Sequence, residues 1–204
     1  MRDIKATLFI SLDGVVDGME NWHFEYFNDE MGAAVDRVMS TADTLLLGRV
    51  TYDSFAGAWP KVEAEGEGED AAFAKHLGDA RKIVVSNQDL EFSWRNSEQL
   101  KGDLIEGVRA LKNEPGETHI AMSGSPSVVR QLLAAGLIDE LHLLVHPVVV
   151  RKGMRLFGEG DSPIPLKLVS SEKLTTGVLN LVYAPERTSA ATAGAEAVTA
   201  NYRS

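Results

Sequence analysis

The sequence of 204 residues contains no cysteine. Disulfide bonds, thiolate nucleophiles and cysteine-ligated zinc or iron–sulfur sites are therefore excluded. Long hydrophobic runs are missing too: no apolar segment approaches the roughly 20 residues that are needed to cross a bilayer. Asp3 and Lys5 interrupt the N-terminal segment, where a secretory signal peptide needs an unbroken apolar stretch. We therefore expect a cytoplasmic protein with no membrane partner.

Positive charge is scarce in this chain. Lysine and arginine number 20 against 30 aspartate and glutamate residues, which gives a formal net charge of −10 at pH 7. Nucleic-acid binding draws on a surface rich in lysine and arginine, which releases counterions from the phosphates. The sequence therefore predicts no nucleic-acid partner. An anionic small ligand would have to be held locally, by arginines and by the backbone N–H groups of helix starts.

Familiar phosphate-binding and catalytic motifs are also missing. The chain has no G-x-G-x-x-G, and although Gly153 and Gly158 have the P-loop spacing, Glu159 stands where that motif requires lysine. Without a G-x-S-x-G elbow, hydrolase chemistry has little support. His142 and His146 lie in a strand-like segment, where residues four apart are separated by about 13 Å. We predict no metal site.

Strand-like and helix-like segments alternate along most of the chain. We expect helices near residues 28–44, 71–77, 103–112 and 125–137, and strands at residues 8–12, 44–47, 81–87, 118–125, 139–150, 166–174 and 178–184. Such alternation, followed by a hairpin, predicts an α/β fold with a mixed, mostly parallel sheet and an antiparallel C-terminal edge. Residues 1–185 are expected to form one domain, residues 186–204 a peripheral tail, and the acidic, glycine-rich residues 63–70 a solvated loop.

Small and polar residues follow three of the expected strands. Ligands of open α/β sheets gather at the carboxyl ends of strands, where glycines allow close approach, helix starts supply N–H groups and arginine pairs with phosphate oxygens. Each cluster alone is more typical of an ordinary turn or helix cap. Together they predict a site for a ligand with several phosphates, such as a dinucleotide, at Gly48, Arg49, Thr51, Ser86, Asn87, Ser123, Gly124 and Ser125.

Two further groups of residues are candidates for binding a substrate. Arg151, Lys152 and Arg155 form the one compact basic cluster in the sequence, which suits either a substrate phosphate or a charged hairpin rim. Trp22 heads a run of four aromatic residues between positions 22 and 27, which could line a pocket for a flat heterocycle or belong to the core. The sequence leaves the alternatives for the basic cluster open, whereas aromatic residues at this density more often belong to the core.

Taken together, several segments resemble the dihydrofolate reductase superfamily. The resemblance is carried by SLDG, LLLGRVTYDSF, IVVSN, MSGSPSVVRQLLAAGLIDELHLLVHPVV and GMRLF, and it covers about residues 4–183. It is strongest to the reductase domain of bifunctional riboflavin-biosynthesis deaminase/reductases and to stand-alone relatives of that domain. It implies a dihydrofolate reductase-like three-layer fold with about eight strands, which binds NADPH across the strand ends described above.

The resemblance also implies roles for individual residues. Gly48, Arg49 and Thr51 would meet the adenosine-side phosphates, Ser86 the adenine ribose, and Gly124 and Ser125 the pyrophosphate. Ser123 departs from the family, which often has glycine there. A carboxylate near the start of the first helix would hold the substrate and assist protonation. The candidate catalytic residues are therefore Asp29 and Glu30, with Asp13 in the loop that covers the nicotinamide.

The function that this resemblance implies is NADPH-dependent transfer of hydride to a C=N bond. The substrate would be heterocyclic or ribosylamino, such as a riboflavin intermediate, a folate or a pterin, contacted by Trp22, Arg151 and Arg155. Zinc-deaminase motifs are missing, so only the reductase half is expected. The alternatives are a non-catalytic NADPH-binding or sensor protein and a vestigial site. Relatives often associate through their C-terminal strands, and residues 141–150 are strongly apolar, which predicts a homodimer.

Overall fold

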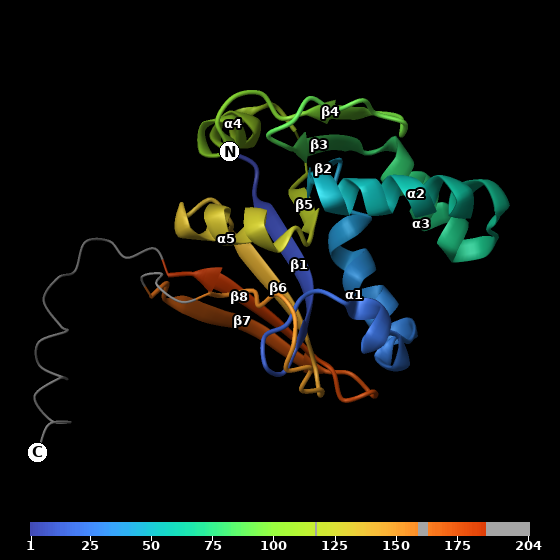
Figure 1. Ribbon diagram of the computed structural model, residues 1–204, viewed down its shortest axis with the longest axis vertical. Helices are drawn as coiled ribbons and strands as arrows, with labels where there is room; N and C mark the ends of the chain where they lie inside the picture. The colour runs from blue at the N-terminus through green and yellow to red at the C-terminus, as the bar shows by residue number, and fades with distance from the viewer. Residues whose placement is uncertain (117, 159–162, 187–204) are drawn as a thin grey trace, which may run out of the picture.

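A computed structural model of the protein (Figure 1) describes residues 1–116, 118–158 and 163–186. The strands of its single sheet are β1 (Ile4–Ser11), β2 (Thr44–Gly48), β3 (Arg81–Val85), β4 (Ser97–Gln99), β5 (Ile120–Ser123), β6 (Glu140–His146), β7 (Leu166–Lys173) and β8 (Leu179–Pro185). The helices are α1 (Asp29–Met39), α2 (Arg49–Glu65), α3 (Gly68–Asp79), α4 (Leu104–Asn113) and α5 (Pro126–Ala134), with two short 3-10 helices, η1 (Met19–Asn21) and η2 (Phe24–Tyr26).

The spatial order of the strands is β4-β3-β2-β5-β1-β6-β8-β7. All pairs from β4 to β6 are parallel, and β8 pairs antiparallel with both β6 and β7. The expected α/β fold, with a mostly parallel sheet and an antiparallel C-terminal hairpin, is therefore confirmed. The short strand β4, which is polar at all three positions, was not expected from the sequence pattern.

Helices cover both faces of the sheet and make three layers (Figure 1). Alternation along each strand divides its side chains between two cores. In β2, Leu46 packs with the residues of α4 and α5, whereas Leu45 and Leu47 pack on the other face with residues of α1, α2 and α3. Because the strands are covered on both sides, β2 is a continuous apolar run, as buried parallel strands usually are.

Helix boundaries follow from local chemistry. The Asn28 side chain accepts a hydrogen bond from the N–H of Met31 at 3.1 Å and caps the start of α1. Asp103 caps α4 in the same way. Gly136, with a φ of 65°, follows α5 in the left-handed conformation that ends many helices. Each of these three positions was recognisable in the sequence or lies within one residue of the expected boundary.

The sheet opens between β1 and β2 because the strand between them is short. β5 stays paired with β2 only over Thr44↔Ile120 and Leu45↔Ala121, and its pairing with β1 stops at Thr7↔Ser123. The pairing of β1 with β6 continues to Ser11↔His146. Beyond the end of β5, the last residues of β1 and β2 therefore border a gap at the carboxyl edge of the sheet.

Two expectations about local structure need correction. Residues 63–70 are mostly helical, because α2 runs to Glu65 and α3 starts at Gly68, which leaves only residues 66 and 67 as a connection. The strand expected over residues 139–150 ends at His146. Its apolar side chains are covered within the molecule, since β6 lies between β1 and β8.

The tail expected at residues 186–204 lies, except for Glu186, outside the described residues. Among the helices that the structure does describe, none is both long and apolar enough to cross a membrane.

Candidate functional site

A groove with a volume of about 1570 Å³ occupies the gap at the carboxyl edge of the sheet. Ordinary small-molecule pockets measure roughly 300–1,000 Å³, so this groove has room for two ligands side by side. Its lining comes from the carboxyl ends of β2, β3 and β5, from the middle of β1, and from α1, α2, α3 and α5. Residues 16–20, after β1, and Met154 also contribute to it. Two parts of the groove differ in chemistry and are described in turn.

The first part, called here the amide part, consists of residues 48–51, 86–88 and 123–127. Its centre is a contact between the ends of two strands. The hydroxyl of Ser125 accepts a hydrogen bond from the N–H of Gly48 at 2.7 Å and lies 2.7 Å from the Thr51 hydroxyl. A Cβ atom at Gly48 would lie only 2.6 Å from the Ser125 Oγ, so this approach requires glycine.

The contact brings the N-terminal ends of α2 and α5 together at one place. α2 begins at Arg49, directly after Gly48, and α5 begins at Pro126, directly after Ser125. The first N–H groups of a helix lack intrahelical partners and carry partial positive charge. Two such helix starts beside each other form a site suited to the phosphates of an extended ligand.

A sharp turn sets the direction in which α5 enters the groove. Gly124 and Ser125 have φ values of 68° and 29°, both in the left-handed region. The N–H of Gly124 donates to the carbonyl of Thr7 at 2.9 Å, which fixes the turn against β1. Ser123, at the position where the family often has glycine, ends β5 and lines the groove.

The rest of the amide part comes from β3 and the start of α2. The N–H of Gln88 donates to the hydroxyl of Ser86 at 3.0 Å, which closes a turn with Asn87 at its tip. The Arg49 guanidinium forms an ion pair with Asp53 at 2.9 Å on the exposed side of α2. All eight residues predicted to bind a cofactor therefore line the same groove.

The second part, called here the aromatic part, lies between α1, α2 and α3. α1 and the residue that follows it present small and acidic side chains at helical spacing, namely Asp29, Gly32, Ala33, Asp36 and Ser40. Because glycine and alanine occupy the middle of this stripe, the helix leaves space in front of it. Five aromatic side chains complete the lining, from Phe9, Phe27, Phe55, Trp59 and Phe73. Flat apolar rings fit such a surface.

The three predicted catalytic carboxylates are placed differently. Asp29 lines the groove, while Asp13 and Glu30 do not. The Ser11 hydroxyl and the N–H groups of Val150 and Arg151 donate to Asp13 at 2.7, 3.0 and 2.8 Å, and together they lower its pKa to about 2.

Glu30 is also engaged outside the groove. It accepts hydrogen bonds from the N–H and the hydroxyl of Thr175, at 2.7 Å each, which lower its pKa. Asp13 and Glu30 therefore connect loops through their hydrogen bonds. Of the three predicted catalytic residues, Asp29 is the one that faces the cavity.

The three residues predicted to contact substrate lie outside the lining of the groove. Trp22 is buried, and its indole N–H donates to the carbonyl of Asp17 at 3.0 Å. Arg151 is exposed with a φ of 71°, and the Arg155 guanidinium donates to the carbonyl of Asp13 at 2.7 Å. Of the two readings of the basic cluster, the structure favours the charged rim of a loop.

Behind the aromatic part, two histidine side chains contact each other. His23 Nδ1 lies 3.0 Å from His146 Nε2, and both residues are buried. Burial, with a smaller effect from His146, lowers the pKa of His23 to about 4, and burial lowers the pKa of His146 as well. The Phe9 ring, which lines the groove, lies 4.1 Å from the His23 ring centre to centre. The pair therefore supports the floor of the cavity in its uncharged form.

Sequence reasoning missed three kinds of groove residue: Asp36, Thr7 and the aromatics of α2 and α3. Asp36 lies seven residues after Asp29, so both fall on one helix face, a spacing that could have revealed it. The Thr7 hydroxyl is buried, and no described protein group hydrogen-bonds to it. Phe55 and Trp59 could not be found, because no helix was expected over residues 49–65. Phe73 lies in a helix that was expected, but nothing in its local sequence connects it to the groove.

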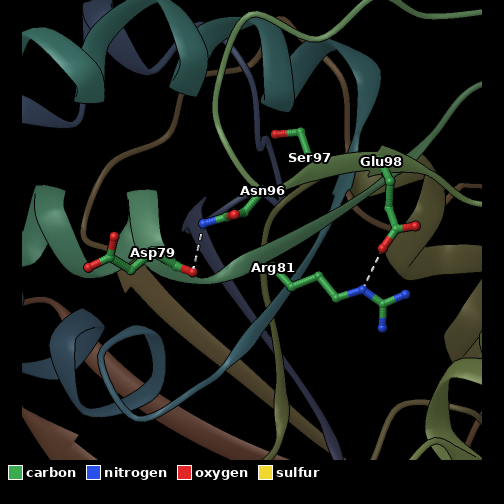
Figure 2. Close-up of a pocket in the computed structure, with 5 residues that line it drawn as sticks. All are labelled: Asp79, Arg81, Asn96, Ser97 and Glu98. Atoms are coloured by element: carbon green, nitrogen blue, oxygen red, sulfur yellow. Dashed lines mark hydrogen bonds and ion pairs between the residues drawn. The ribbon is translucent and has the colours of Figure 1, made fainter.

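A second, smaller pocket of about 400 Å³ lies at the opposite edge of the sheet, where β3 begins (Figure 2). Arg81 crosses it and donates to Glu98 at 2.5 Å, and it also pairs with Glu114. The Asn96 amide donates to the carbonyl of Asp79 at 3.1 Å. Each charged side chain that lines this pocket already forms an ion pair, within the lining or with a neighbouring residue. The large groove is therefore the candidate site.

Comparison with known proteins agrees with this geometry. The family model of the RibD C-terminal domain matches residues 2–180. The chain belongs to the RibD C-terminal domain family. This confirms the resemblance identified from the sequence. A Bacillus subtilis (strain 168) relative, the uncharacterized protein YyaP, is 29% identical over 188 residues, which are 89% of this chain and 94% of YyaP.

Solved structures show that this member of the RibD C-terminal domain family has the dihydrofolate reductase fold. A Shewanella sp. PV-4 protein provisionally assigned to riboflavin biosynthesis superposes with a TM-score of 0.69 and 20% identity, over 92% of this chain and 100% of that one. Enterococcus faecalis dihydrofolate reductase, complexed with NADP(H) and RAB-propyl, superposes with a TM-score of 0.59 and 15% identity, over 90% and 96%.

Proposed function

We propose that this protein is a reductase that binds NADPH in the groove and transfers hydride to a C=N bond of a heterocyclic or ribosylamino substrate. The observation that carries the proposal is that one groove joins two parts of different chemistry, an amide part suited to phosphates and an aromatic part suited to a flat ring. Membership of the RibD C-terminal domain family and the complex of the E. faecalis enzyme with NADP(H) support the choice of cofactor.

The residues of the amide part fit the cofactor that the family implies. The N–H groups at the starts of α2 and α5, with the hydroxyl of Thr51, would hold the phosphates, and Arg49 would add the positive charge that an additional ribose phosphate needs. Ser86 and Asn87 would contact the adenosine side. When bound, NADPH supplies the hydride, and the protein supplies orientation and electrostatics.

The residues of the aromatic part would then position the substrate. Phe9 and the aromatic side chains of α2 and α3 exclude water around a ring, and the Thr7 hydroxyl is a buried hydrogen-bonding group that a ligand could satisfy. Asp29, at the start of α1, is the carboxylate that would hold a proton for the reduced nitrogen or orient a water molecule that delivers it.

We also propose that the protein is a homodimer. The apolar residues of β6 are covered by the protomer itself, so an interface cannot be built from them as the sequence suggested. β7 is the edge strand of the sheet, and its Leu168 and Val169 are exposed by 49% and 56%. An exposed apolar edge strand is a surface that a second copy can cover.

The Arg49→Ala variant tests the proposed cofactor site. If Arg49 pairs with a phosphate of NADPH, its loss weakens binding by about 1.5–3 kcal/mol, or roughly 10- to 150-fold, because charged hydrogen bonds contribute that much. The measurement is a titration with NADPH followed by tryptophan fluorescence and calorimetry, with NADH as the comparison. Arg109→Ala is the matched control, because Arg109 is also exposed, pairs with Glu106 three residues away and lies outside the groove. Equal affinities of the two variants would contradict the assignment.

Turnover distinguishes the reductase from the alternative of a non-catalytic NADPH-binding or sensor protein. Oxidation of NADPH, followed by its absorbance against a panel of pyrimidine, pterin and folate substrates, is expected for at least one of them. Saturable NADPH binding without oxidation of any substrate supports the sensor. No saturable binding of NADPH would contradict both.

A further inference from the structure

We propose that the substrate of this site is an unphosphorylated flat ring that is neutral or positively charged. The inference rests on the proposed function and narrows the substrate class. A ribosylamino substrate with a phosphate needs positively charged side chains around the phosphate. A protonated ring is stabilised by carboxylates, and a neutral ring needs neither charge. The charges that line the groove decide between these classes.

Acidic side chains outnumber basic ones in the lining of the groove. Six carboxylates contribute to it, from Asp17, Glu20, Asp29, Asp36, Glu69 and Asp70. In the described part of the chain, none of the six forms an ion pair with an arginine, a lysine or a histidine. The hydrogen bonds that Asp17 accepts from the Met154 N–H and Asp36 from the Ser40 hydroxyl come from uncharged groups, so they bring no positive charge to the carboxylates.

Positive charge in the groove is confined to the amide part. Arg49 is the one arginine or lysine among the described lining residues, and it belongs to the start of α2, where the cofactor phosphates are proposed to bind. His76 also lines the groove, but its Nε2 lies 3.1 and 3.0 Å from the carbonyls of Met39 and Ala42. The aromatic part thus offers a phosphate no cationic partner.

The basic loop does not supply the missing charge. Arg151, Lys152 and Arg155 are exposed and stand outside the lining, and the guanidinium of Arg155 is directed to the carbonyl of Asp13. A phosphate placed in the aromatic part would give up hydration and meet carboxylates of the same sign. A protonated or neutral ring would meet no such penalty, and a cation would gain from Asp29 and Asp36.

A second feature points to a ring with hydrogen-bonding edges. The Thr7 side chain is 4% exposed, its hydroxyl is without a described hydrogen-bond partner, and it lines the groove on the same strand as Phe9. Buried polar groups are normally hydrogen-bonded, so this hydroxyl is suited to a polar atom of a bound ligand. Carboxylates on α1, a hydroxyl on β1 and aromatic walls together describe a site for a planar heterocycle with N–H donors.

The experiment compares planar ligands of one size and opposite charge. Benzamidinium, benzamide and benzoate are titrated into the protein with and without saturating NADP⁺, and binding is measured by calorimetry. We expect benzamidinium to bind about tenfold more tightly than benzoate, since two exposed carboxylates change from attraction to repulsion. This ratio should fall in high salt, which screens the charges.

Variants and a substrate pair complete the test. Asp36→Asn is expected to reduce the benzamidinium preference severalfold, whereas Asp3→Asn, which removes a carboxylate at the other end of β1, leaves it unchanged. A ribosylaminopyrimidine is also compared with its 5′-phosphate as a substrate, and the unphosphorylated form should have the higher kcat/KM. Equal behaviour of benzamidinium and benzoate, including the case in which neither saturates, overturns the proposal, as does preference for the phosphorylated substrate.

Failure of this inference can be told apart from failure of the proposed function. NADPH affinity is measured first, without any ring ligand. If NADPH does not bind, the reductase proposal fails. The preference of the aromatic part for benzamidinium over benzoate can still be measured in the protein without cofactor. If NADPH binds and the phosphorylated substrate is preferred, the reductase proposal stands and the substrate class is wrong.

Discussion

Replacing Gly48 by alanine tests whether the contact between β2 and the start of α5 organises the amide part. The new Cβ atom would lie 2.6 Å from the Ser125 Oγ and 2.8 Å from its Cβ. Neither neighbour is the far end of a flexible chain, since Ser125 is buried and fixed by the turn after β5. The backbone must therefore move, and the hydrogen bond from the Gly48 N–H to Ser125 is strained or lost.

The expected cost follows from these two effects. Overpacking of a close-packed site costs about 1–3 kcal/mol, and a lost hydrogen bond adds about 0.5–1.5 kcal/mol. We expect the free energy of unfolding to fall by about 2–4 kcal/mol. With a urea slope of about 2 kcal/mol per molar, the midpoint of urea unfolding falls by about 1–2 M. NADPH affinity should fall as well, because the two helix starts move apart.

Gly57→Ala provides the matched control. Gly57 lies within α2, the helix that begins directly after Gly48, and a Cβ atom there would meet nothing within 4 Å. This substitution should raise stability by about 0.5–1 kcal/mol, as alanine in place of glycine does within helices. A Gly48→Ala cost no greater than that of Gly57→Ala would refute the reasoning.

Ser125→Gly completes a double-mutant cycle, because it removes both atoms that the new Cβ would touch. The cost of Gly48→Ala should be clearly smaller in the Ser125→Gly background. The same cost in both backgrounds would show that the contact with Ser125 is not its source.

Three further predictions concern other parts of the molecule. The pKa of His23 is lowered from 6.5 to about 4, so the unfolded chain binds the proton more readily than the folded protein does. The free energy of unfolding should therefore fall as the pH falls from about 6.5 to about 4. In urea-unfolding measurements over this pH range, His23→Gln should make that fall smaller. The pKa of Asp13 is lowered from 3.8 to about 2, so the stabilising effect of its carboxylate is complete above pH 3.8 and is lost toward pH 2. Asp13→Asn should therefore lower the melting temperature at pH 7. It should change NADPH affinity less than about twofold, since Asp13 lies outside the groove. Light scattering should give the mass of a homodimer, and Leu168→Lys with Val169→Lys on the exposed edge strand should shift it to a monomer; a wild-type monomer would contradict the proposal.

The features that the sequence predicted best are those with local causes. Apolar runs that end in Gly48, Ser86 and Gly124 identify strand ends by themselves, and parallel pairing brings such ends to one edge of a sheet. For this reason the residues of the amide part were found together, although the sequence contains no standard dinucleotide motif. The cap of α1 and the end of α5 are equally local and were predicted within a residue.

Features that depend on packing between distant segments were not predictable in this way. The partner of His23 is His146, 123 residues away, and no spacing rule connects them. Lys82 lies fully buried in β3, where its ammonium group donates to three carbonyls at the end of α3, while charged residues ordinarily indicate exposed positions. Pro60 within α2 breaks the usual helical pattern, because proline removes a backbone donor, and so concealed the helix that carries Trp59.

The shortness of β5 has a consequence for how proteins of this architecture can change. Four residues suffice for this strand, and the cavity exists because the backbone stops there, whatever side chains surround the opening. Substitutions on α1 or α2 can therefore exchange one acceptable molecule for another while the supporting framework keeps its shape and stability. A fold of this kind is well suited to evolutionary diversification, since a few substitutions on α1 and α2 are enough to change the ligand that it prefers.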